Sequence, residues 1–284
     1  KYTSAAVKGL DNVSQSELEV DAHLHFRDGI TSKEIQETLI KTAVDKIDID
    51  APNWTFVASR LFLFNLYHQV NGFTGYCTLE KYFDKGEKTG RILLGLKEMY
   101  DLEELEKHIV PERDLQFNYL GIKTLYDRYL IKDSQACPIE LPQHMFMAIA
   151  MFLAQREEDR QGWAIKFYNM ISTFEVMLAT PTLSNARTTR HQLSSCYIGS
   201  TPDNIEGIFD AYQEMAMLSK FGGGIGWDWT RIRSMGSSID GHKNAAGGSV
   251  PFLKITNDIA IAVDQLGTRK GAIAVYMEPW HIDI

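Results

Sequence analysis

The stretch from residue 180 to residue 284 restricts the possible folds more than any other part of the sequence. Short strand-like runs alternate there with helical runs, and Gly, Asn and Ser separate them. Such alternation is typical of an α/β domain with parallel strands, because the helices connect neighbouring strands and cover the sheet. The expected elements are a strand at 193–198, a helix from 203, a strand through Trp227 and Trp229, a loop at 234–248, a helix at 251–263 and a strand at 272–277.

The first helix of this stretch has clear expected ends. Asp203 stands three residues before Glu206, which is the spacing of a reciprocal capping box. The glycine-rich run 222–226 is expected to end the helix. One apolar face is predicted to contain Ile205, Ile208, Phe209, Tyr212 and Met215.

Residues 1–179 are predicted to be mostly helical, with three helices in the first seventy residues. Ser14 with Glu17 and Thr31 with Glu34 both have the capping-box spacing. Two further helical runs are expected at 143–155 and 157–178. The large apolar residues of the second run are interpreted as core, namely Trp163, Phe167, Met170, Ile171, Phe174 and Met177.

Composition excludes several classes of protein. The chain is 44% hydrophobic and 23% charged, as a globular protein would be, and its net charge is −8. This acidic balance argues against a broad surface for nucleic acid or anionic membrane, which requires clustered Lys and Arg. The sequence has neither a continuous apolar run of membrane-spanning length nor an apolar secretory leader at its start. We therefore expect neither nucleic acid nor membrane as a partner.

The three cysteines, Cys77, Cys137 and Cys196, are too few and too widely spaced for a disulfide scaffold or a zinc site. No metal ligands are predicted, and a reducing cytoplasm is the expected compartment. Cys77 and Cys137 are interpreted as buried structural thiols. Cys196 is ambiguous, because a lone cysteine on a short strand is either a small buried hydrophobe or a functional thiol.

Two arginines precede the glycine-rich loop. Arg231 and Arg233 beside such a loop suit triphosphate recognition, since guanidinium groups bind phosphate oxygens in pairs. A solvated surface loop is the simpler alternative, and the same two interpretations apply to residues 265–271.

Six motifs occur in an order and at spacings that resemble the large subunits of class I ribonucleotide reductases. Each is weak alone, but together they span about a hundred residues. They are found at 179–186, at 192–196, at 203–208, at 223–226 with 231–233, at 267–271 and at 276–281.

The resemblance implies a helical N-terminal region followed by the first part of a ten-stranded α/β barrel. Residues 1–70 would be a partial ATP-cone, residues 71–179 a helical domain and residues 180–284 the start of the barrel. The apolar end at 280–284 and the absence of an initial Met suggest a fragment. The hairpin that holds the triphosphate in the family's ATP-cone would precede residue 1, so ATP binding by this stretch is not expected.

The resemblance also implies chemistry. The family reduces ribonucleoside diphosphates to deoxyribonucleotides, for DNA replication, by a thiyl radical and a redox pair of cysteines. Cys196 matches the first cysteine of that pair, and its partner belongs to sequence outside this stretch. Thr180 and Ser195 match substrate-binding positions. Because the partner cysteine and the radical cysteine are both missing, this stretch alone is expected to be inactive.

Effector sites follow from the same resemblance. Asp203, Arg233 and Ile239 match a specificity site for a deoxynucleoside triphosphate, and Arg269 lies in a second loop of that site. Four residues match the activity site for ATP or dATP: Ser32, Ile35, Gln36 and His68.

Several partners are implied as well. They are a metal-containing small subunit that supplies the radical, a second large subunit packed through the helix after Asp203, and thioredoxin or glutaredoxin as reductant. The chain itself is expected to bind no cofactor. Two alternatives stay open: a truncated or split nucleotide-binding regulatory subunit without catalysis of its own, and an adenosylcobalamin-dependent reductase.

Overall fold

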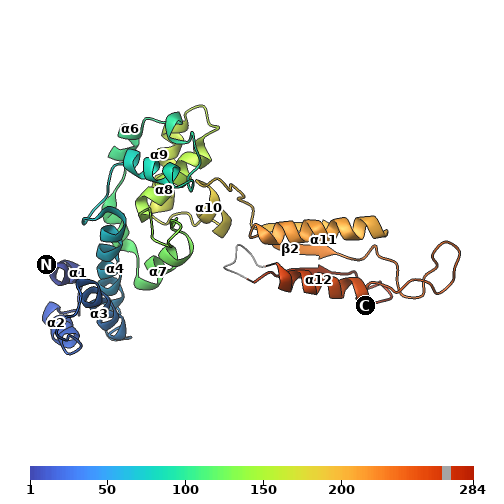
Figure 1. Ribbon diagram of the computed structural model, residues 1–284, viewed down its shortest axis with the longest axis horizontal. Helices are drawn as coiled ribbons and strands as arrows, with labels where there is room; N and C mark the ends of the chain where they lie inside the picture. The colour runs from blue at the N-terminus through green and yellow to red at the C-terminus, as the bar shows by residue number, and fades with distance from the viewer. Residues whose placement is uncertain (264–269) are drawn as a thin grey trace. The chain divides into compact units, whose positions relative to one another are not determined.

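A computed structural model describes residues 1–263 and 270–284 (Figure 1). The chain divides into two compact units. The helical unit comprises residues 1–178 and 183–191, and the α/β unit comprises residues 179–182 and 192–284. Each unit contains its own hydrophobic core.

The helical unit begins with four helices rather than the three expected. They are α1 (Tyr2–Val7), α2 (Gln15–His23), α3 (Ser32–Asp45) and α4 (Trp54–Asn71). Then follow α5 (Leu79–Lys88), α6 (Leu102–Lys107), α7 (Tyr119–Arg128), α8 (Pro142–Ala154) and α9 (Arg160–Ser172), with short 3-10 turns at Lys97–Met99 and Pro111–Gln116.

One of the two capping boxes predicted in the helical unit is confirmed. Thr31 Oγ1 accepts from Glu34 N at 3.2 Å, and Glu34 Oε2 accepts from Thr31 N at 2.8 Å, so both ends of the box close at the start of α3. Ser14 caps α2 by accepting from Glu17 N, but Glu17 does not reciprocate. Its carboxylate instead accepts from Lys46 Nζ at 2.7 Å, which ties α2 to the end of α3.

Helix α8 lies at the centre of the helical unit, and twelve of its thirteen residues are buried. Helix α9 packs on it through Ala164, Tyr168 and Ile171, which lie on one face. Of the six large apolar residues interpreted as core, Ile171 is buried and Phe167 is half-buried. The interpretation was wrong for the other four: Trp163, Met170, Phe174 and Met177 are 38%, 41%, 37% and 75% exposed. The helix covers α8 with a single stripe, and Met177 lies beyond its end.

Two buried carboxylates organise this unit. Asp114 accepts from the hydroxyls of Tyr67 and Tyr76, at 2.8 and 2.6 Å, and from Gln143 Nε2 at 2.8 Å. Burial raises its pKa to about 6, against the donors, which act in the opposite direction.

Glu140 is the second buried carboxylate. It forms a two-point ion pair with Arg187, and both side chains are fully buried. Glu140 also accepts from Tyr82 Oη and from Ile131 N. Arg187 also donates to the carbonyls of Leu183 and Tyr129. Its charge is thus balanced by Glu140, and its remaining N–H groups have hydrogen-bond acceptors.

The α/β unit contains a three-stranded parallel sheet in the order β1 (Cys196–Ser200), β2 (Gly224–Asp228), β3 (Ile273–Tyr276). Helix α11 (Ile205–Lys220) connects β1 to β2, and α12 (Val250–Ala262) precedes β3. The predicted fold class, a helical region followed by the start of a parallel α/β sheet, is confirmed.

Several predicted boundaries were wrong. Helix α10 (Thr180–Asn185) forms in a segment where no helix was predicted. Strand β1 begins at Cys196 rather than Leu193, and Trp229 follows β2 rather than lying in it. Of the run 222–226, Gly222 follows α11 with φ +87°, whereas the last three residues form the first part of β2.

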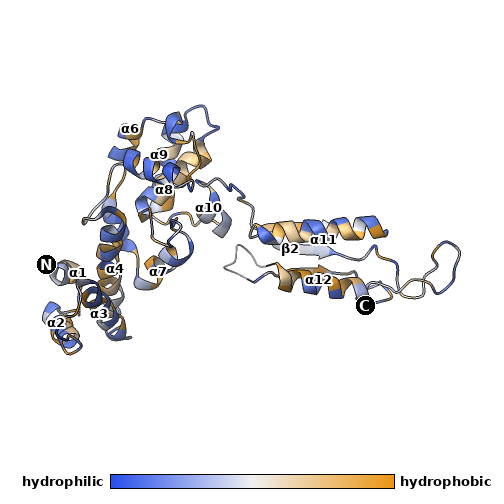
Figure 2. Ribbon diagram, in the orientation of Figure 1, coloured by the Kyte–Doolittle hydropathy of each residue, from blue (hydrophilic) through white to orange (hydrophobic). Residues whose placement is uncertain are grey.

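Only part of the apolar face expected on α11 is buried. Ile208, Tyr212 and Met215 pack with Ile225 and Trp227 of β2. Ile205 and Phe209 are 59% and 57% exposed and lie outside this contact. Hydrophilic and hydrophobic residues alternate along both α11 and α12 (Figure 2).

The buried ion pair predicts a large loss of stability for Arg187→Met. Removing the guanidinium leaves the Glu140 carboxylate buried without a counter-charge. The free energy of unfolding, measured in urea, should therefore fall by about 3–5 kcal/mol. Arg27→Met is the matched control, because Arg27 pairs with Glu34 on the surface and its side chain is 76% exposed. That control should lose less than about 0.5 kcal/mol. Equal losses in the two variants would contradict this account.

Asp114 predicts a pH dependence. Because its pKa is raised from 3.8 to about 6 on folding, its contribution to stability is complete below pH 3.8 and is lost as pH rises through 6. From about pH 5 to about pH 7.5, the free energy of unfolding of the wild-type chain should therefore fall by about 1 kcal/mol relative to that of Asp114→Asn. Urea unfolding at the two pH values measures this, and parallel pH profiles would show that Asp114 does not titrate in this range.

Candidate functional site

Cys196 is the first residue of β1 and its side chain is exposed. The preceding residue, Ser195, anchors the neighbouring strand, because its carbonyl accepts from Gly224 N at 2.7 Å. Ser195 Oγ lies 3.7 Å from Cys196 Sγ. The predicted catalytic thiol and the predicted substrate contact Ser195 are therefore adjacent in the structure.

Two glycines of β2 lie on the same face of the sheet as this thiol. The register pairs Cys196 with Gly224 and Ile198 with Gly226. A Cβ on Gly226 would lie 2.8 Å from the Tyr276 ring, and one on Gly224 would lie 3.3 Å from the Ser195 carbonyl. Alternate residues of β2, Ile225 and Trp227, point into the core, so the glycines lie on the opposite face. Their period of two was a usable sequence signal, but the run had been interpreted as a helix end.

Thr180, the other predicted substrate contact, begins α10 and belongs to the same compact unit as Cys196. A hydrogen bond from Thr182 Oγ1 to the Leu193 carbonyl, at 3.5 Å, connects this helix to the segment that leads into β1.

Asp203 and Arg233 meet at the start of α11. Arg233 Nε donates to Asp203 Oδ2 at 2.8 Å, and Arg233 N donates to Oδ1 at 3.1 Å. The predicted capping role of Asp203 was wrong: Asn204 is the N-cap and accepts from Gly207 N at 2.8 Å. Both Asp203 and Asn204 are residue types that cap helices. Asn204 caps α11 because the Asp203 carboxylate accepts from Arg233.

These two residues lie on the wall of a pocket of about 400 Å³. Ile239 lines the same pocket from the glycine-rich loop, where it pairs with His242. Three of the four predicted specificity-site residues therefore come together, and Arg269 lies outside the described residues. The other lining residues are Asn204, Ile205, Ile208, Ile232, Asp240, Ala246, Gly247, Gly248 and Phe252.

The pocket combines apolar walls with the Arg233 guanidinium and two carboxylates, those of Asp203 and Asp240. The Arg233 and Asp203 side chains are 37% and 33% exposed, so both are reachable from solvent. Arg233 also donates to the carbonyls of Ser238 and Asp203, at 3.4 and 3.3 Å, which holds the guanidinium at the pocket wall. An anion that takes over part of these bonds would be held by charge-assisted hydrogen bonds.

The predicted activity-site residues lie in the helical unit. Ser32, Ile35 and Gln36 occupy the first two turns of α3, which packs on α4. His68 on α4 bonds through Nε2 to Tyr2 Oη at 2.7 Å and to Thr74 Oγ1 at 3.0 Å.

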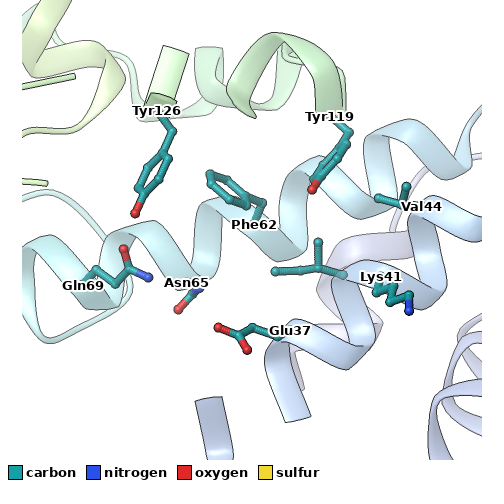
Figure 3. Close-up of a pocket in the computed structure, with 9 residues that line it drawn as sticks. Glu37, Lys41, Val44, Phe62, Asn65, Gln69, Tyr119 and Tyr126 are labelled. Atoms are coloured by element: carbon teal, nitrogen blue, oxygen red, sulfur yellow. The ribbon is translucent and has the colours of Figure 1, made fainter. Parts of the chain in front are cut away.

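A pocket of about 330 Å³ lies nearby, between α3, α4 and α7. In Figure 3, Tyr126, Gln69, Asn65 and Glu37 gather on one side of Phe62, and Tyr119, Val44 and Lys41 lie on the other. Its lining includes none of the four predicted activity-site residues.

The other two cysteines lie in the helical unit. Cys77 is half-buried, and burial raises its pKa, as expected for a structural thiol. Cys137 is exposed, so its interpretation as a buried thiol was wrong.

Comparison with known proteins identifies the family. A model described as the ribonucleotide reductase barrel domain matches residues 194–284, and one described as the all-alpha domain of the same enzyme matches residues 115–191. Together they cover more than half of the chain. The chain therefore belongs to the ribonucleotide reductase family, as a part of its large, or alpha, subunit.

Similar curated proteins agree. The chain is 72% identical over 284 residues to ribonucleoside-diphosphate reductase subunit alpha of Helicobacter pylori, covering 100% of this chain and 36% of the relative. The Chlamydia trachomatis protein of that name is 42% identical over 92% of this chain and 26% of its own length. The large subunit of Monkeypox virus is 35% identical over 90% of this chain and 34% of its own length. The chain thus spans a quarter to just over a third of these relatives.

Within residues 1–263 and 270–284, no helix is both long and apolar enough to cross a membrane.

Arg233 is predicted to give the pocket its affinity for anions. Arg233→Gln should weaken binding of inorganic tripolyphosphate at least about tenfold, because it removes a charged donor. Arg231→Gln is the control, since Arg231 is exposed and does not line the pocket. Isothermal titration of both variants measures the difference. Equal affinities would mean that the anion binds elsewhere.

Proposed function

We propose that the complete protein, of which this chain is a part, reduces ribonucleoside diphosphates to deoxyribonucleotides, and that Cys196 is one of its two redox thiols. The observation that carries this proposal is the exposed Cys196 side chain at the start of a parallel strand, next to a position without a side chain, Gly224. Family membership gives independent support.

The proposed reaction balances as a two-electron reduction. Two thiols are oxidised to a disulfide, the ribose 2′-hydroxyl leaves as water, and hydrogen takes its place on C2′. The second thiol must come within disulfide distance, with Cα atoms less than about 7 Å apart. Cys77 and Cys137 both lie in the helical unit, so we assign the partner to sequence beyond this stretch. Thiol–disulfide exchange with thioredoxin or glutaredoxin would restore the pair.

The substrate would lie on the side of the sheet opposite α11. Cys196, Ile198 and Ser200 are exposed there, and Gly224 beside Cys196 has no side chain to keep a sugar from the backbone. Ser195 and Thr180 would contact the sugar and phosphates.

The pocket of Asp203 and Arg233 would bind a deoxynucleoside triphosphate that sets substrate choice. Asp203 would accept from a ribose hydroxyl, Arg233 would hold phosphate, and Ile239 would contact the nucleotide from the loop. Because Asp203 and Arg233 bond to each other, the nucleotide must take over part of that ion pair. Arg269 is assigned to the second loop of the site. ATP or dATP would bind near Ser32, Ile35, Gln36 and His68 and regulate overall activity.

Further chains complete the proposed enzyme. A metal-containing small subunit would supply the radical that starts the reaction. A second large subunit would pack through α11, which is supported by the exposure of Ile205 and Phe209. This chain alone would not turn over.

Cys196→Ser in the complete protein tests the proposal. Multiple-turnover reduction should fall to background, because a serine hydroxyl cannot form the disulfide. Cys137→Ser should retain activity, since Cys137 is exposed in the other unit. Unchanged multiple-turnover reduction by Cys196→Ser would refute the assignment. Activity that requires adenosylcobalamin and no small subunit would place the enzyme in the other branch of the family.

A further inference from the structure

The segment that follows β3 packs along the residues that lead into the glycine-rich loop. Glu278 N donates to Thr230 Oγ1 at 3.1 Å. His281 Nε2 donates to the Ile232 carbonyl at 2.6 Å, so its Nδ1 is free to accept, and it does so from Asp283 N at 3.1 Å. These bonds bring the Asp283 carboxylate to the loop.

Asp283 bonds to both ends of that loop. Its Oδ1 accepts from Met235 N at 2.8 Å. Its Oδ2 accepts from Ser249 N at 2.8 Å and from Ser249 Oγ at 3.0 Å. One carboxylate thus joins the residue before the loop 236–248 to the residue after it. The Ser249 and Met235 amides hold the pKa of Asp283 below its usual value, as expected for a carboxylate that accepts such bonds.

The loop between these ends forms a wall of the nucleotide pocket. Its two arms are paired, with Gly236 N donating to the Ala246 carbonyl at 2.9 Å and Ala246 N to the Ser237 carbonyl at 3.1 Å. Beyond the pairing, Ile239 and Asp240 line the pocket.

Gly248 lies between the carboxylate and the pocket. It lines the pocket, and a Cβ there would come within 2.6 Å of Asp283 Oδ2 and 2.8 Å of Met235 N. The Asp283 carboxylate therefore lies close to the backbone of Gly248, where a residue with a side chain would not fit.

We propose that Asp283 is a positioning residue for the pocket of Asp203 and Arg233: by binding both ends of the loop 236–248, it fixes the wall that contacts the nucleotide. This inference rests on the proposed nucleotide function of that pocket. Asp283 does not touch the pocket itself, and its effect on nucleotide affinity is exerted through the loop.

The chemistry of the contact requires a carboxylate. Three donors converge on Asp283, and an ionised carboxylate is a pure acceptor. In Asp283→Asn the amide can still accept from Met235 N, but its NH₂ group then faces the Ser249 N–H as a second donor. The loop 236–248 should lose its bonds to residue 283 at Ser249. The segment after β3 should keep the hydrogen bond of His281 to the Ile232 carbonyl.

Binding of each of the four deoxynucleoside triphosphates to the complete large subunit tests the inference, together with hydrogen exchange. Among the nucleotides that Arg233→Gln weakens, Asp283→Asn should weaken the best-bound one about tenfold. It should also speed exchange in peptides covering 234–249, with unchanged exchange at β1 and β2. Ser249→Ala removes only the hydroxyl bond and should show a smaller effect of the same kind. Asp258→Asn is the charge-matched control on α12, because Asp258 is exposed.

The outcomes separate the two proposals. If the native subunit binds no deoxynucleotide that Arg233→Gln weakens, the nucleotide function of the pocket fails. If the native subunit binds and Asp283→Asn binds equally well, the positioning role of Asp283 is overturned. Faster exchange across the whole sheet would also overturn it, since the carboxylate would then stabilise the fold in general. Should Asp283→Asn not fold, Ser249→Ala decides by the same two measurements.

Discussion

The ion pair of Glu140 and Arg187 is the interaction on which the placement of the connecting segment depends. Residues 183–191 belong to the helical unit, whereas residues 179–182 and those from 192 onward belong to the α/β unit. Arg187 holds this segment through the Glu140 carboxylate and the Tyr129 carbonyl, and the side chains of the ion pair are fully buried. Residues 183–191 are therefore fixed to the helical unit by this contact.

A second constraint acts at the sheet itself. Helix α11 packs against one face of β2 through large side chains, and the other face has glycine at Gly224 and Gly226. One strand therefore has large side chains on its core face and glycines on the other, which is possible because strand residues alternate in direction. The Tyr276 ring lies beside Gly226 on that second face, and Gly224 is the glycine paired with Cys196.

The sequence was sufficient to predict the architecture but not the pairings that build the sites. The alternation of strand-like and helical runs led to the parallel α/β arrangement, and the spacing of Thr31 and Glu34 led to the capping box, because both signals are local. Asp203 and Asn204 are both good caps, and the choice between them is decided by Arg233, thirty residues away. No local pattern contains that information. The exposure of Met170 and Trp163 has the same origin, because helical spacing does not reveal how many faces of α9 are covered. The roles of all the predicted catalytic, substrate-binding and effector-binding residues stay predictions.

Two contacts shape the proposed nucleotide pocket before any ligand arrives. Arg233 is bonded to Asp203, and Asp283 joins the two ends of the loop that carries Ile239. The two contacts have different consequences for binding. The first must be partly exchanged, so it lowers affinity for ligands that offer no replacement for the carboxylate or guanidinium bonds. The second is kept, so it lowers the entropy lost when the loop orders around a ligand. A ligand with an anionic group can replace the bond that Arg233 makes, and a ligand hydroxyl can replace the bond that Asp203 accepts. The pocket therefore favours a ligand that has both groups over a simple anion, and a nucleotide has both.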